Sequence, residues 1–244
     1  MSDSDALKRA AAERAVAYVQ SGMVVGLGTG STAVFAVRRI GALLAAGELQ
    51  RIVGIPTAEV TTREAERCGV PLGSLDDYPA VDITIDGADE IDPRLNLIKG
   101  LGGALLREKI VAAASRRLII VADESKRVAQ LATRAPVPVE VIPFARRPAA
   151  DYLATLGARV VERQRDGRPF ITDEGNIILD CYFAGLADPA AMAARLRAQP
   201  GVVEHGLFLG MAAAAVVAGE RGVIVLPPHP ESGGSEFPLP TGEG

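Results

Sequence analysis

The sequence predicts an α/β fold, in which a large domain built on a parallel sheet carries an inserted, smaller α+β domain of ferredoxin-like pattern. Two observations support this prediction. In the first half of the chain, short β-branched runs alternate with helical patterns, which is typical of parallel strands joined by crossover helices. From about residue 135 the order changes to strand, helix, strand, strand, helix, strand, which is the split β-α-β pattern.

The large domain should consist of short strands that alternate with amphipathic helices. We expect strands at residues 23–28, 51–55, 81–86, 95–98 and 118–122, and helices at residues 5–20, from 32 onward, 61–68 and 104–115. Val34, Val37 and Ile40 lie on one stripe of the second helix, as packing against a sheet requires. A helix at residues 211–217 and a strand at residues 222–226 should return the chain to this domain.

The small domain and the end of the chain follow a different pattern. We expect strands at residues 137–142, 158–163, 170–172, 176–183 and 202–207, and helices at residues 149–156 and 190–198. The predicted domain bounds are therefore 1–134 plus 207–228 for the large domain and 135–206 for the small one. Residues 229–244 are rich in proline, glycine and serine and cannot bury enough apolar surface to offset the entropy of ordering, so we expect a flexible tail.

The composition narrows the range of partners. The chain has 244 residues, of which 48% are hydrophobic, and a formal net charge of −4. This charge provides no broad basic face for DNA, and the 4% of aromatic residues offer little stacking surface for single-stranded bases. No apolar stretch is long enough to span a bilayer. We therefore expect no nucleic acid and no membrane partner, but a small anionic ligand held by a few local positive groups.

The cysteines and histidines indicate a cytoplasmic protein without a histidine-rich metal site. Cys68 and Cys181 are far apart in the sequence and belong to no CxxC pair, which is typical of thiols in a reduced compartment. The first residues lack the apolar segment of a signal peptide. His205 and His229 alone cannot form a histidine-rich metal site, whereas magnesium binding by carboxylates alone stays open at this stage.

A glycine-rich segment at residues 26–32, Gly-Leu-Gly-Thr-Gly-Ser-Thr, follows a predicted strand and opens a helix. Backbone N–H groups at such a helix start, together with the helix dipole, form an anion site. We expect the glycines to permit close approach to the anion, and Ser31 and Thr32 to offer hydroxyls and a helix N-cap. A tight turn that binds nothing is the alternative interpretation.

Neither nucleotide-binding fingerprint fits this segment. The second strand ends in Ile55-Pro-Thr57, without the acidic residue that binds a ribose in the dinucleotide pattern. The Walker pattern fails because no Gly-Lys-Ser/Thr follows. A compact phosphate monoester is therefore the expected ligand.

An acidic segment at residues 86–92 ends the third predicted strand. Four acids within seven residues resemble a cation site, but their spacing is not that of an EF-hand loop. A solvated acidic turn is the alternative. Asp86 ends the apolar run 83–85, so we expect it to lie partly inside the protein, where a sugar hydroxyl is a natural partner for its carboxylate.

A second glycine-rich segment, Lys-Gly-Leu-Gly-Gly at residues 99–103, precedes a helix that contains Glu108. Taken alone, Glu108 and Lys126 would be ordinary surface residues. However, the residues at 29–32, 86–89, 99 and 126 all follow predicted strands, and ligands bind at the carboxyl edge of open parallel sheets. Their convergence on one edge favours a binding site.

These motifs resemble type A ribose-5-phosphate isomerase. The likeness rests on GTGST at 28–32, DGADE at 86–90, KGLGGALLREK at 99–109, ADESK at 122–126 and PVEVIP at 138–143. Their order and spacing agree with the family from about residue 5 to residue 226. The resemblance implies a Rossmann-like large domain, a smaller α+β domain, no cofactor, and a homodimer or homotetramer that acts on a small sugar phosphate.

The resemblance also implies roles for individual residues. The substrate-binding residues would be Thr29, Gly30, Ser31, Thr32, Asp86, Gly87, Ala88, Asp89, Lys99, Gly100, Leu101, Gly102 and Lys126. Glu108 would accept the proton, and Asp86, Asp89 and Lys99 would complete the catalytic groups. Lys8 in the first helix is a further candidate for the phosphate.

The implied reaction is the interconversion of D-ribose 5-phosphate and D-ribulose 5-phosphate in the non-oxidative pentose phosphate pathway. A proton moves between C2 and C1 of the open-chain sugar, so one carboxylate can serve both carbons across an enediolate. Lys99 is the candidate for stabilising the developing oxyanion. Asp86 or Asp89 could manage the hydroxyl protons and ring opening.

Two other function classes stay open from the sequence. Sugar-phosphate sensor domains of transcription regulators share this kind of fold, but they carry a helix-turn-helix ahead of the sensor, and only one helix fits before Gly26. A coenzyme A transferase also combines a catalytic glutamate with glycine loops. The pair of motifs at 86–90 and 99–109 disfavours that class.

Overall fold

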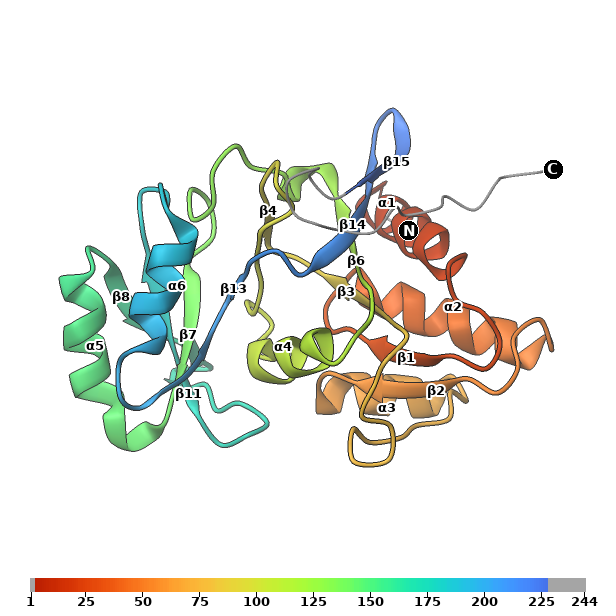
Figure 1. Cartoon of the computed structure of the whole chain (residues 1–244), viewed down its shortest axis with the longest axis horizontal. Helices are drawn as coiled ribbons and strands as arrows, with labels where there is room; N and C mark the ends of the chain where they lie inside the picture. Colours follow the sequence, from red (N-terminus) through yellow and green to blue (C-terminus); the bar gives the residue numbers. More distant parts are fainter. Residues whose placement is uncertain (1–2, 228–244) are drawn as a thin grey trace. The chain divides into compact units, whose positions relative to one another are not determined.

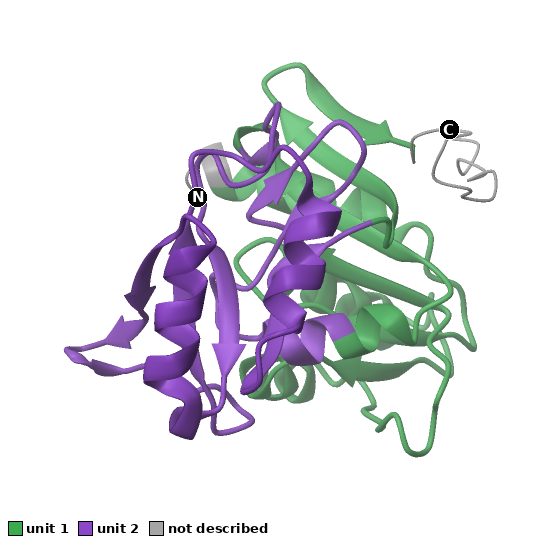
Figure 2. Cartoon of the chain, turned by 60° about the vertical axis from the view of Figure 1, so that its left-hand side comes forward, with its two compact units in different colours: residues 1–87, 110–125, 210–244 green, residues 88–109, 126–209 purple. Residues whose placement is uncertain are grey.

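A computed structural model describes residues 3–227 of the chain. The predicted flexible tail at 229–244, with His229, lies outside the described residues. The chain divides into two compact units (Figure 2). Unit 1 comprises Met1–Gly87, Ile110–Ser125 and Gly210–Gly244, and unit 2 comprises Ala88–Lys109 and Lys126–Leu209. The domain bounds expected from the sequence stay a prediction.

Unit 1 is built on a six-stranded sheet in the order β15-β14-β6-β3-β1-β2 (Figure 1). The strands are β1 (Val24–Leu27), β2 (Val53–Pro56), β3 (Ile83–Gly87), β6 (Leu118–Asp123), β14 (Ala212–Gly219) and β15 (Gly222–Leu226). Neighbouring strands run parallel except β14 and β15, which are antiparallel. Because β1 lies between β2 and β3, the strand order reverses there, and this is the position where open parallel sheets bind ligands.

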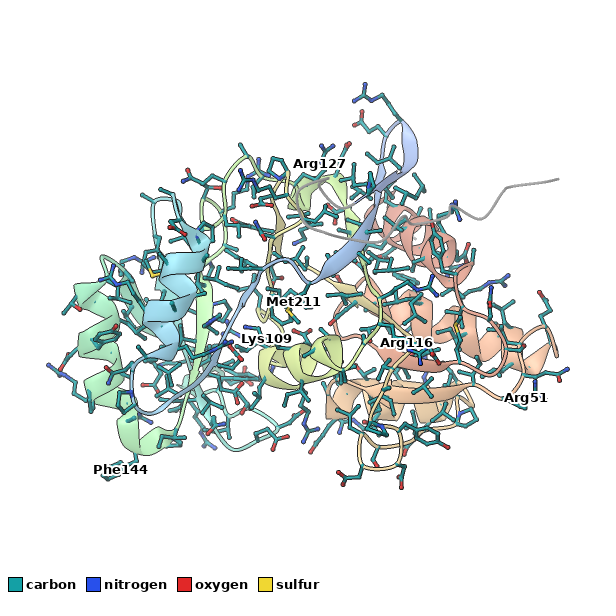
Figure 3. All side chains as sticks on the ribbon, viewed as in Figure 1. Arg51, Lys109, Arg116, Arg127, Phe144 and Met211 are labelled. Carbon is teal, nitrogen blue, oxygen red and sulfur yellow. The ribbon has the colours of Figure 1, made fainter. Side chains whose placement is uncertain are left out.

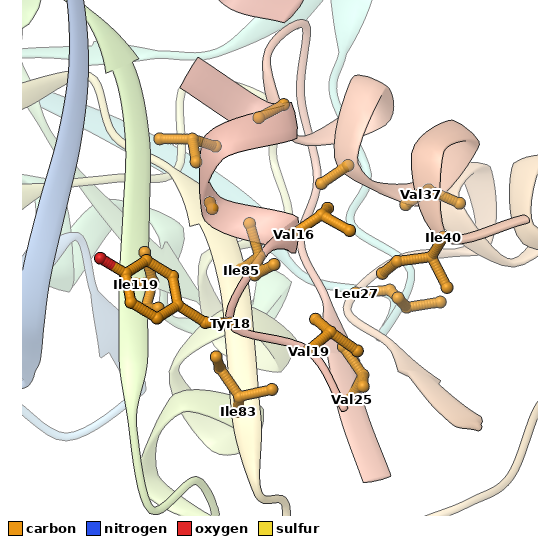
Figure 4. Close-up of a cluster of buried hydrophobic side chains, with 14 of the residues drawn as sticks. Val16, Tyr18, Val19, Val25, Leu27, Val37, Ile40, Ile83, Ile85 and Ile119 are labelled. Atoms are coloured by element: carbon orange, nitrogen blue, oxygen red, sulfur yellow. The ribbon is translucent and has the colours of Figure 1, made fainter. Parts of the chain in front are cut away.

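The larger core of unit 1 lies between this sheet and the helices α1 (Asp3–Val16) and α2 (Ala33–Ala45). Figure 4 shows the apolar side chains that meet there. Val25 and Leu27 of β1 and Ile85 of β3 contribute to this cluster, since alternate residues of a strand point to the same face.

A smaller apolar cluster includes Val24, which alternates with Val25 along β1. It combines Val24 and Ile55 with Val111 of α4 (Leu105–Ala113). The remaining helix of unit 1, α3 (Glu59–Arg67), follows β2 directly. This layered arrangement confirms the predicted α/β class with a Rossmann-like, mostly parallel sheet.

Unit 2 contains a four-stranded antiparallel sheet in the order β12-β7-β11-β8. Its elements in chain order are β7 (Val137–Val141), α5 (Arg146–Thr155), β8 (Arg159–Glu162), β11 (Ile177–Tyr182), α6 (Pro189–Arg197) and β12 (Val202–His205). The first strand is therefore flanked by the fourth and the third, as in ferredoxin-like folds. The predicted pattern of the smaller α+β part is confirmed.

Unit 2 also holds short elements around that sheet. They are β4 (Glu90–Ile91), β5 (Leu97–Ile98) and β13 (Leu207–Phe208) in a three-stranded sheet, the hairpin of β9 (Gln164–Arg165) and β10 (Arg168–Pro169), and the 3₁₀ helix η2 (Pro143–Ala145). A second 3₁₀ helix, η1 (Glu124–Lys126), follows β6. Phe144 of η2 is 95% exposed and points away from its ribbon (Figure 3).

Four predictions about elements were wrong. The strand expected at 170–172 is reduced to one isolated bridge between Ile171 and Ile177. The run at residues 211–217 is not a helix but forms most of β14. Its alanines favour a helix locally, which explains the prediction. The run nevertheless forms a strand because it pairs with β6 and β15 on its two sides. The strand expected at 95–98 belongs to the three-stranded sheet and pairs with β4 and β13, not with the parallel sheet. The strand expected at 202–207 is divided at Gly206.

Across residues 3–227, no helix combines the length and the apolar character that crossing a bilayer requires.

Candidate active site

The glycine-rich segment follows β1, beside Asp86 at the end of β3, so the reversal point of the sheet joins two of the predicted motifs. Asp86 is 1% exposed, and its Oδ1 accepts hydrogen bonds from the backbone N–H of Thr29 at 3.0 Å and of Gly87 at 2.7 Å. A Cβ at Gly28 would lie 2.3 Å from Asp86 Oδ1. Glycine at this position therefore lets the carboxylate approach the loop.

The three glycines of this segment serve different purposes. A Cβ at Gly26 would lie 1.8 Å from Thr84 Oγ1, so this glycine permits close packing inside the sheet. Gly30 has no atom near its missing Cβ but has a φ of +117°, which other residues rarely adopt. For Gly26 and Gly28, the expectation that glycine makes room for the anion is therefore replaced by packing against strand β3.

The hydroxyls of this segment do not all face the same way. Thr29 Oγ1 lies 2.8 Å from both Thr57 Oγ1 and Thr61 Oγ1, so its hydroxyl is bound within unit 1. Ser31 is exposed, and Thr32 is the N-cap residue of α2. However, Thr32 makes no side-chain cap hydrogen bond, so the predicted capping by its hydroxyl is not made.

A cavity of about 320 Å³ in unit 1 adjoins the segment on the side of α2 and α3. Its walls are mostly apolar and include Val34, Val37 and Val60. Its two charged residues, Arg38 and Glu64, form an ion pair at 2.5 Å. This cavity is a poor environment for a phosphate, whereas the exposed Gly30 and Ser31 can present donors to solvent.

The acidic residues of the segment at 86–92 have different structural roles. Glu90 is fully buried, and its carboxylate accepts hydrogen bonds from three backbone N–H groups at 2.6–2.7 Å, those of Ala132, Arg134 and Ala135. Asp92 accepts bonds from Asn96, including the backbone N–H at 2.8 Å. Within residues 3–227, no group of three or more such side chains could hold a metal ion.

Asp89 is half-buried, as Asp92 is, and contacts the second glycine-rich loop. Its Oδ2 accepts a hydrogen bond from the backbone N–H of Leu101 at 3.0 Å. Ala88 is also half-buried, whereas Leu101 and Gly102 are exposed. Asp89 therefore orders the predicted substrate loop and remains accessible.

Lys99 and Glu108 form a buried ion pair in unit 2. Lys99 Nζ lies 3.3 Å from Glu108 Oε1, and the two residues are 2% and 4% exposed. The surface position that the isolated sequence suggested for Glu108 is therefore wrong, because α4 turns this residue inward. The pair places a carboxylate, the group that a general base requires, next to an ammonium.

The loop that follows Lys99 is held by a residue that the sequence did not suggest. Arg163 donates hydrogen bonds to the carbonyl oxygens of Gly100 at 2.7 Å and Leu101 at 3.0 Å. Its guanidinium also pairs with both oxygens of Asp180. No local signal marks Arg163, because its partners lie far away in the sequence.

Phe208 of β13 connects Lys99 to a second buried cluster. The ammonium groups of Lys99 and Lys109 lie 5.4 Å and 4.7 Å from the centre of the Phe208 ring. Lys109, labelled in Figure 3, also lies 2.8 Å from Glu204 Oε1. Burial lowers the pKa of Lys109 to about 8, although the contact with Glu204 partly opposes this effect.

His205 completes this cluster and is 3% exposed. Its Nδ1 accepts a hydrogen bond from the backbone N–H of Leu207 at 3.3 Å and lies 3.2 Å from Lys109 Nζ. Burial, followed by the positive charge of Lys109, lowers the pKa of His205 to about 4. The imidazole is therefore neutral at pH 7 and serves as an acceptor in the structure.

Lys126 and Lys8 are the remaining predicted cationic residues. Lys126 ends η1 after β6, and Lys8 lies in α1; both are half-buried. Both residues are therefore partly accessible to solvent.

Comparison of this chain with known proteins identifies its family. A sequence profile for ribose 5-phosphate isomerase A (phosphoriboisomerase A) matches residues 53–222. The ribose-5-phosphate isomerase A of Roseiflexus castenholzii is 56% identical over 225 residues, which cover 92% of this chain and 96% of that protein. This chain belongs to the ribose 5-phosphate isomerase A family.

Solved structures agree with this assignment to ribose 5-phosphate isomerase A. Ribose 5-phosphate isomerase from Plasmodium falciparum has a TM-score of 0.89 at 42% identity, and the match covers 91% of this chain and 98% of that one. A D-ribose-5-phosphate isomerase in complex with phospho-erythronic acid has a TM-score of 0.91 at 39% identity, covering 93% and 100%. The chain is an aldose-ketose isomerase that interconverts ribose 5-phosphate and ribulose 5-phosphate.

Proposed function

We propose that Glu108 transfers the proton in this isomerisation and that Lys99 stabilises the oxyanion. The observation that carries the proposal is the buried Lys99–Glu108 ion pair at 3.3 Å. It combines a base with a positive charge, and both are shielded from water, where electrostatic stabilisation is strongest. The Lys99 ammonium also lies over the Phe208 ring, 5.4 Å from its centre, where a cation is stabilised by the ring.

The proposed reaction keeps protons and electrons balanced. In the forward direction, the Glu108 carboxylate removes the proton from C2 of the open-chain aldose, and the C–H electrons form a C1=C2 double bond while O1 becomes an oxyanion. The Lys99 ammonium stabilises this charge. Asp86 or Asp89 moves the O2 hydroxyl proton to O1, and protonated Glu108 returns its proton to C1, which leaves the ketone at C2.

We assign the other predicted residues to substrate binding. The segment at 29–32 and Lys126 take the phosphate, because Gly30 and Ser31 offer exposed backbone donors and a hydroxyl, and Lys126 offers an ammonium. Asp86, Gly87, Ala88 and Asp89 and the loop at 99–102 take the sugar hydroxyls. The hydrogen bond from Leu101 N–H to Asp89 supports this grouping, since it holds the exposed loop beside a carboxylate. The known complex of a relative with phospho-erythronic acid also fits a site for acyclic sugar phosphates.

The proposal extends to the setting of the enzyme. We infer a cytoplasmic homodimer or homotetramer that needs no cofactor. Cys68 and Cys181 are both free thiols, which suits a reducing compartment. Phe144, 95% exposed, is the kind of side chain that an interface between subunits would cover.

Replacement of Glu108 tests the proposal directly. Glu108→Gln keeps the size of the side chain and an oxygen for Lys99 but removes the basic carboxylate. Because general bases contribute about 10²–10⁴-fold, we expect kcat for ribose 5-phosphate to fall by at least about 100-fold with little change in KM. Ribulose 5-phosphate formation is measured in a coupled assay, and circular dichroism confirms folding.

Glu174→Gln is the matched control. Glu174 is a partly exposed glutamate, and its carboxylate pairs with Arg107 of α4, the helix that also carries Glu108. It should keep the wild-type kcat. A folded Glu108→Gln variant that retains more than about a tenth of wild-type kcat would exclude Glu108 as the base.

A further inference from the structure

Thr29 belongs to a chain of three threonine hydroxyls that lies inside unit 1. The other members are Thr57, which follows β2 and is fully buried, and Thr61 in the first turn of α3, which is 5% exposed. Thr29 Oγ1 lies 2.8 Å from each of the other two hydroxyl oxygens. Two elements distant in the sequence therefore meet at the glycine-rich segment.

Proton counting shows how the Thr29 hydroxyl is used. Thr57 Oγ1 donates its proton to the Leu27 carbonyl oxygen at 3.0 Å, so the proton between Thr29 and Thr57 has to come from Thr29. Thr61 Oγ1 donates its proton to the Gly28 carbonyl oxygen at 3.3 Å, so Thr29 has one proton for its contacts with both threonines. The three hydroxyls are therefore joined through Thr29 and anchored on the carbonyl oxygens of Leu27 and Gly28.

The backbone around the chain is tied in the same way. The Thr57 N–H also donates to Leu27 O at 3.0 Å. The Thr29 N–H donates to Asp86 at 3.0 Å. Thr29 has thus used both of its protons on protein acceptors and has none for a phosphate oxygen.

We propose that Thr57 and Thr61 are positioning residues for substrate binding, which act through Thr29 on the glycine-rich segment. Thr29 is in this view a link between Asp86 and the two threonines. The phosphate takes its donors from Gly30, Ser31 and Thr32. This inference rests on the proposed phosphate role of the segment.

The test is a set of near-isosteric substitutions measured by KM for ribose 5-phosphate. Thr57→Val and Thr61→Val remove one hydroxyl each and touch no substrate. We expect each to raise KM about fivefold, the effect of one net hydrogen bond, with kcat within about twofold. Thr57→Ser and Thr61→Ser keep the hydroxyl and should stay near the wild-type KM.

Thr62→Val is the matched control in the same helix. Thr62 is half-buried, and its hydroxyl donates to Ala58 O at 3.2 Å, outside the chain of three. Its loss should leave KM unchanged. The double variant Thr57→Val/Thr61→Val should raise KM by less than the product of the single effects, since both act through Thr29.

Thermal melting and circular dichroism accompany each measurement, because a purely structural role would lower Tm without changing KM. Thr57→Val or Thr61→Val with wild-type KM and a lowered Tm would overturn the inference, as would wild-type KM and Tm. If Thr57→Val does not fold, Thr61→Val decides, because it removes the other hydroxyl that contacts Thr29. If the wild type itself does not turn over ribose 5-phosphate, the functional assignment fails instead.

Discussion

The Lys99 ammonium lies 3.3 Å from the Glu108 carboxylate, and neither residue is more than 4% exposed. The two residues are joined by a glycine-rich loop that Arg163 and Asp89 hold in place. A buried pair of this kind is costly to form and more costly to break on one side. The catalytic proposal therefore predicts a characteristic pattern of stability as well as of activity.

Breaking the pair on one side should destabilise the protein. Lys99→Met leaves the Glu108 carboxylate buried without its ammonium, so we expect a loss of about 3–5 kcal/mol in the free energy of unfolding. Lys99→Met/Glu108→Gln removes both charges and should recover much of this loss while remaining inactive. Urea unfolding followed by circular dichroism measures both values. Equal destabilisation of the single and double variants would argue against a buried pair.

Arg163 should be sensitive even to a conservative change. Lysine keeps the charge but cannot bind Asp180 and the Gly100 and Leu101 carbonyl oxygens at the same time. We expect Arg163→Lys to lower stability by about 2 kcal/mol and to raise KM severalfold, because the substrate loop loosens. Arg168→Lys, at an exposed position of β10, is the control and should change neither. A wild-type KM for Arg163→Lys would limit Arg163 to a structural role.

Lys126 should act mainly on substrate affinity. If its ammonium pairs with the phosphate, Lys126→Ala removes about 2–5 kcal/mol of binding, mostly as an increase in KM. Arg127→Ala is the matched control, because Arg127 is the exposed neighbour in the sequence and has the same charge. Initial rates over a wide range of ribose 5-phosphate separate KM from kcat. Unchanged kinetics would return Lys126 to the solvated surface.

The protein should lose stability in mild acid through His205. Its folded-state pKa of about 4 is below the ordinary value of 6.5. Between these values the unfolded chain binds a proton that the folded chain does not, so stability falls as pH decreases from 6.5 to 4 and this contribution levels off below 4. Urea unfolding at several pH values should show a smaller loss over this window in His205→Gln. Identical pH profiles would refute the buried neutral imidazole.

Activity should be independent of added metal ions. The carboxylates of the acidic segment are used by backbone donors, as Glu90 and Asp92 show, and no metal-binding group of three is found within residues 3–227. We expect kcat and KM to survive prolonged dialysis against a chelator. A loss that magnesium or manganese restores would assign the acidic segment to a cation and would remove Asp86 from its proposed role.

The sequence alone determined the class of fold and the identity of the family. Alternation of β-branched runs with helical stripes predicts parallel strands, and strand-helix-strand-strand-helix-strand predicts the ferredoxin-like sheet of unit 2; both follow from local periodicity. The segments at 28–32, 86–90 and 99–109 identify the family because their residue types are adjacent in the chain. The same local information misled at residues 211–217, where alanine-rich composition indicates a helix but burial in the sheet imposes a strand.

Only the tertiary structure decided how individual side chains are used. Glutamate is a residue type usually found on the surface, and the burial of Glu108 against Lys99 depends on how α4 packs. The link from Thr29 to Thr57 and Thr61, and from Arg163 to the loop after Lys99, joins residues that lie 28 to 63 positions apart. Periodicity and propensity act over a few residues, whereas burial and hydrogen bonding depend on which distant segments meet, and these contacts arise only when the chain has folded.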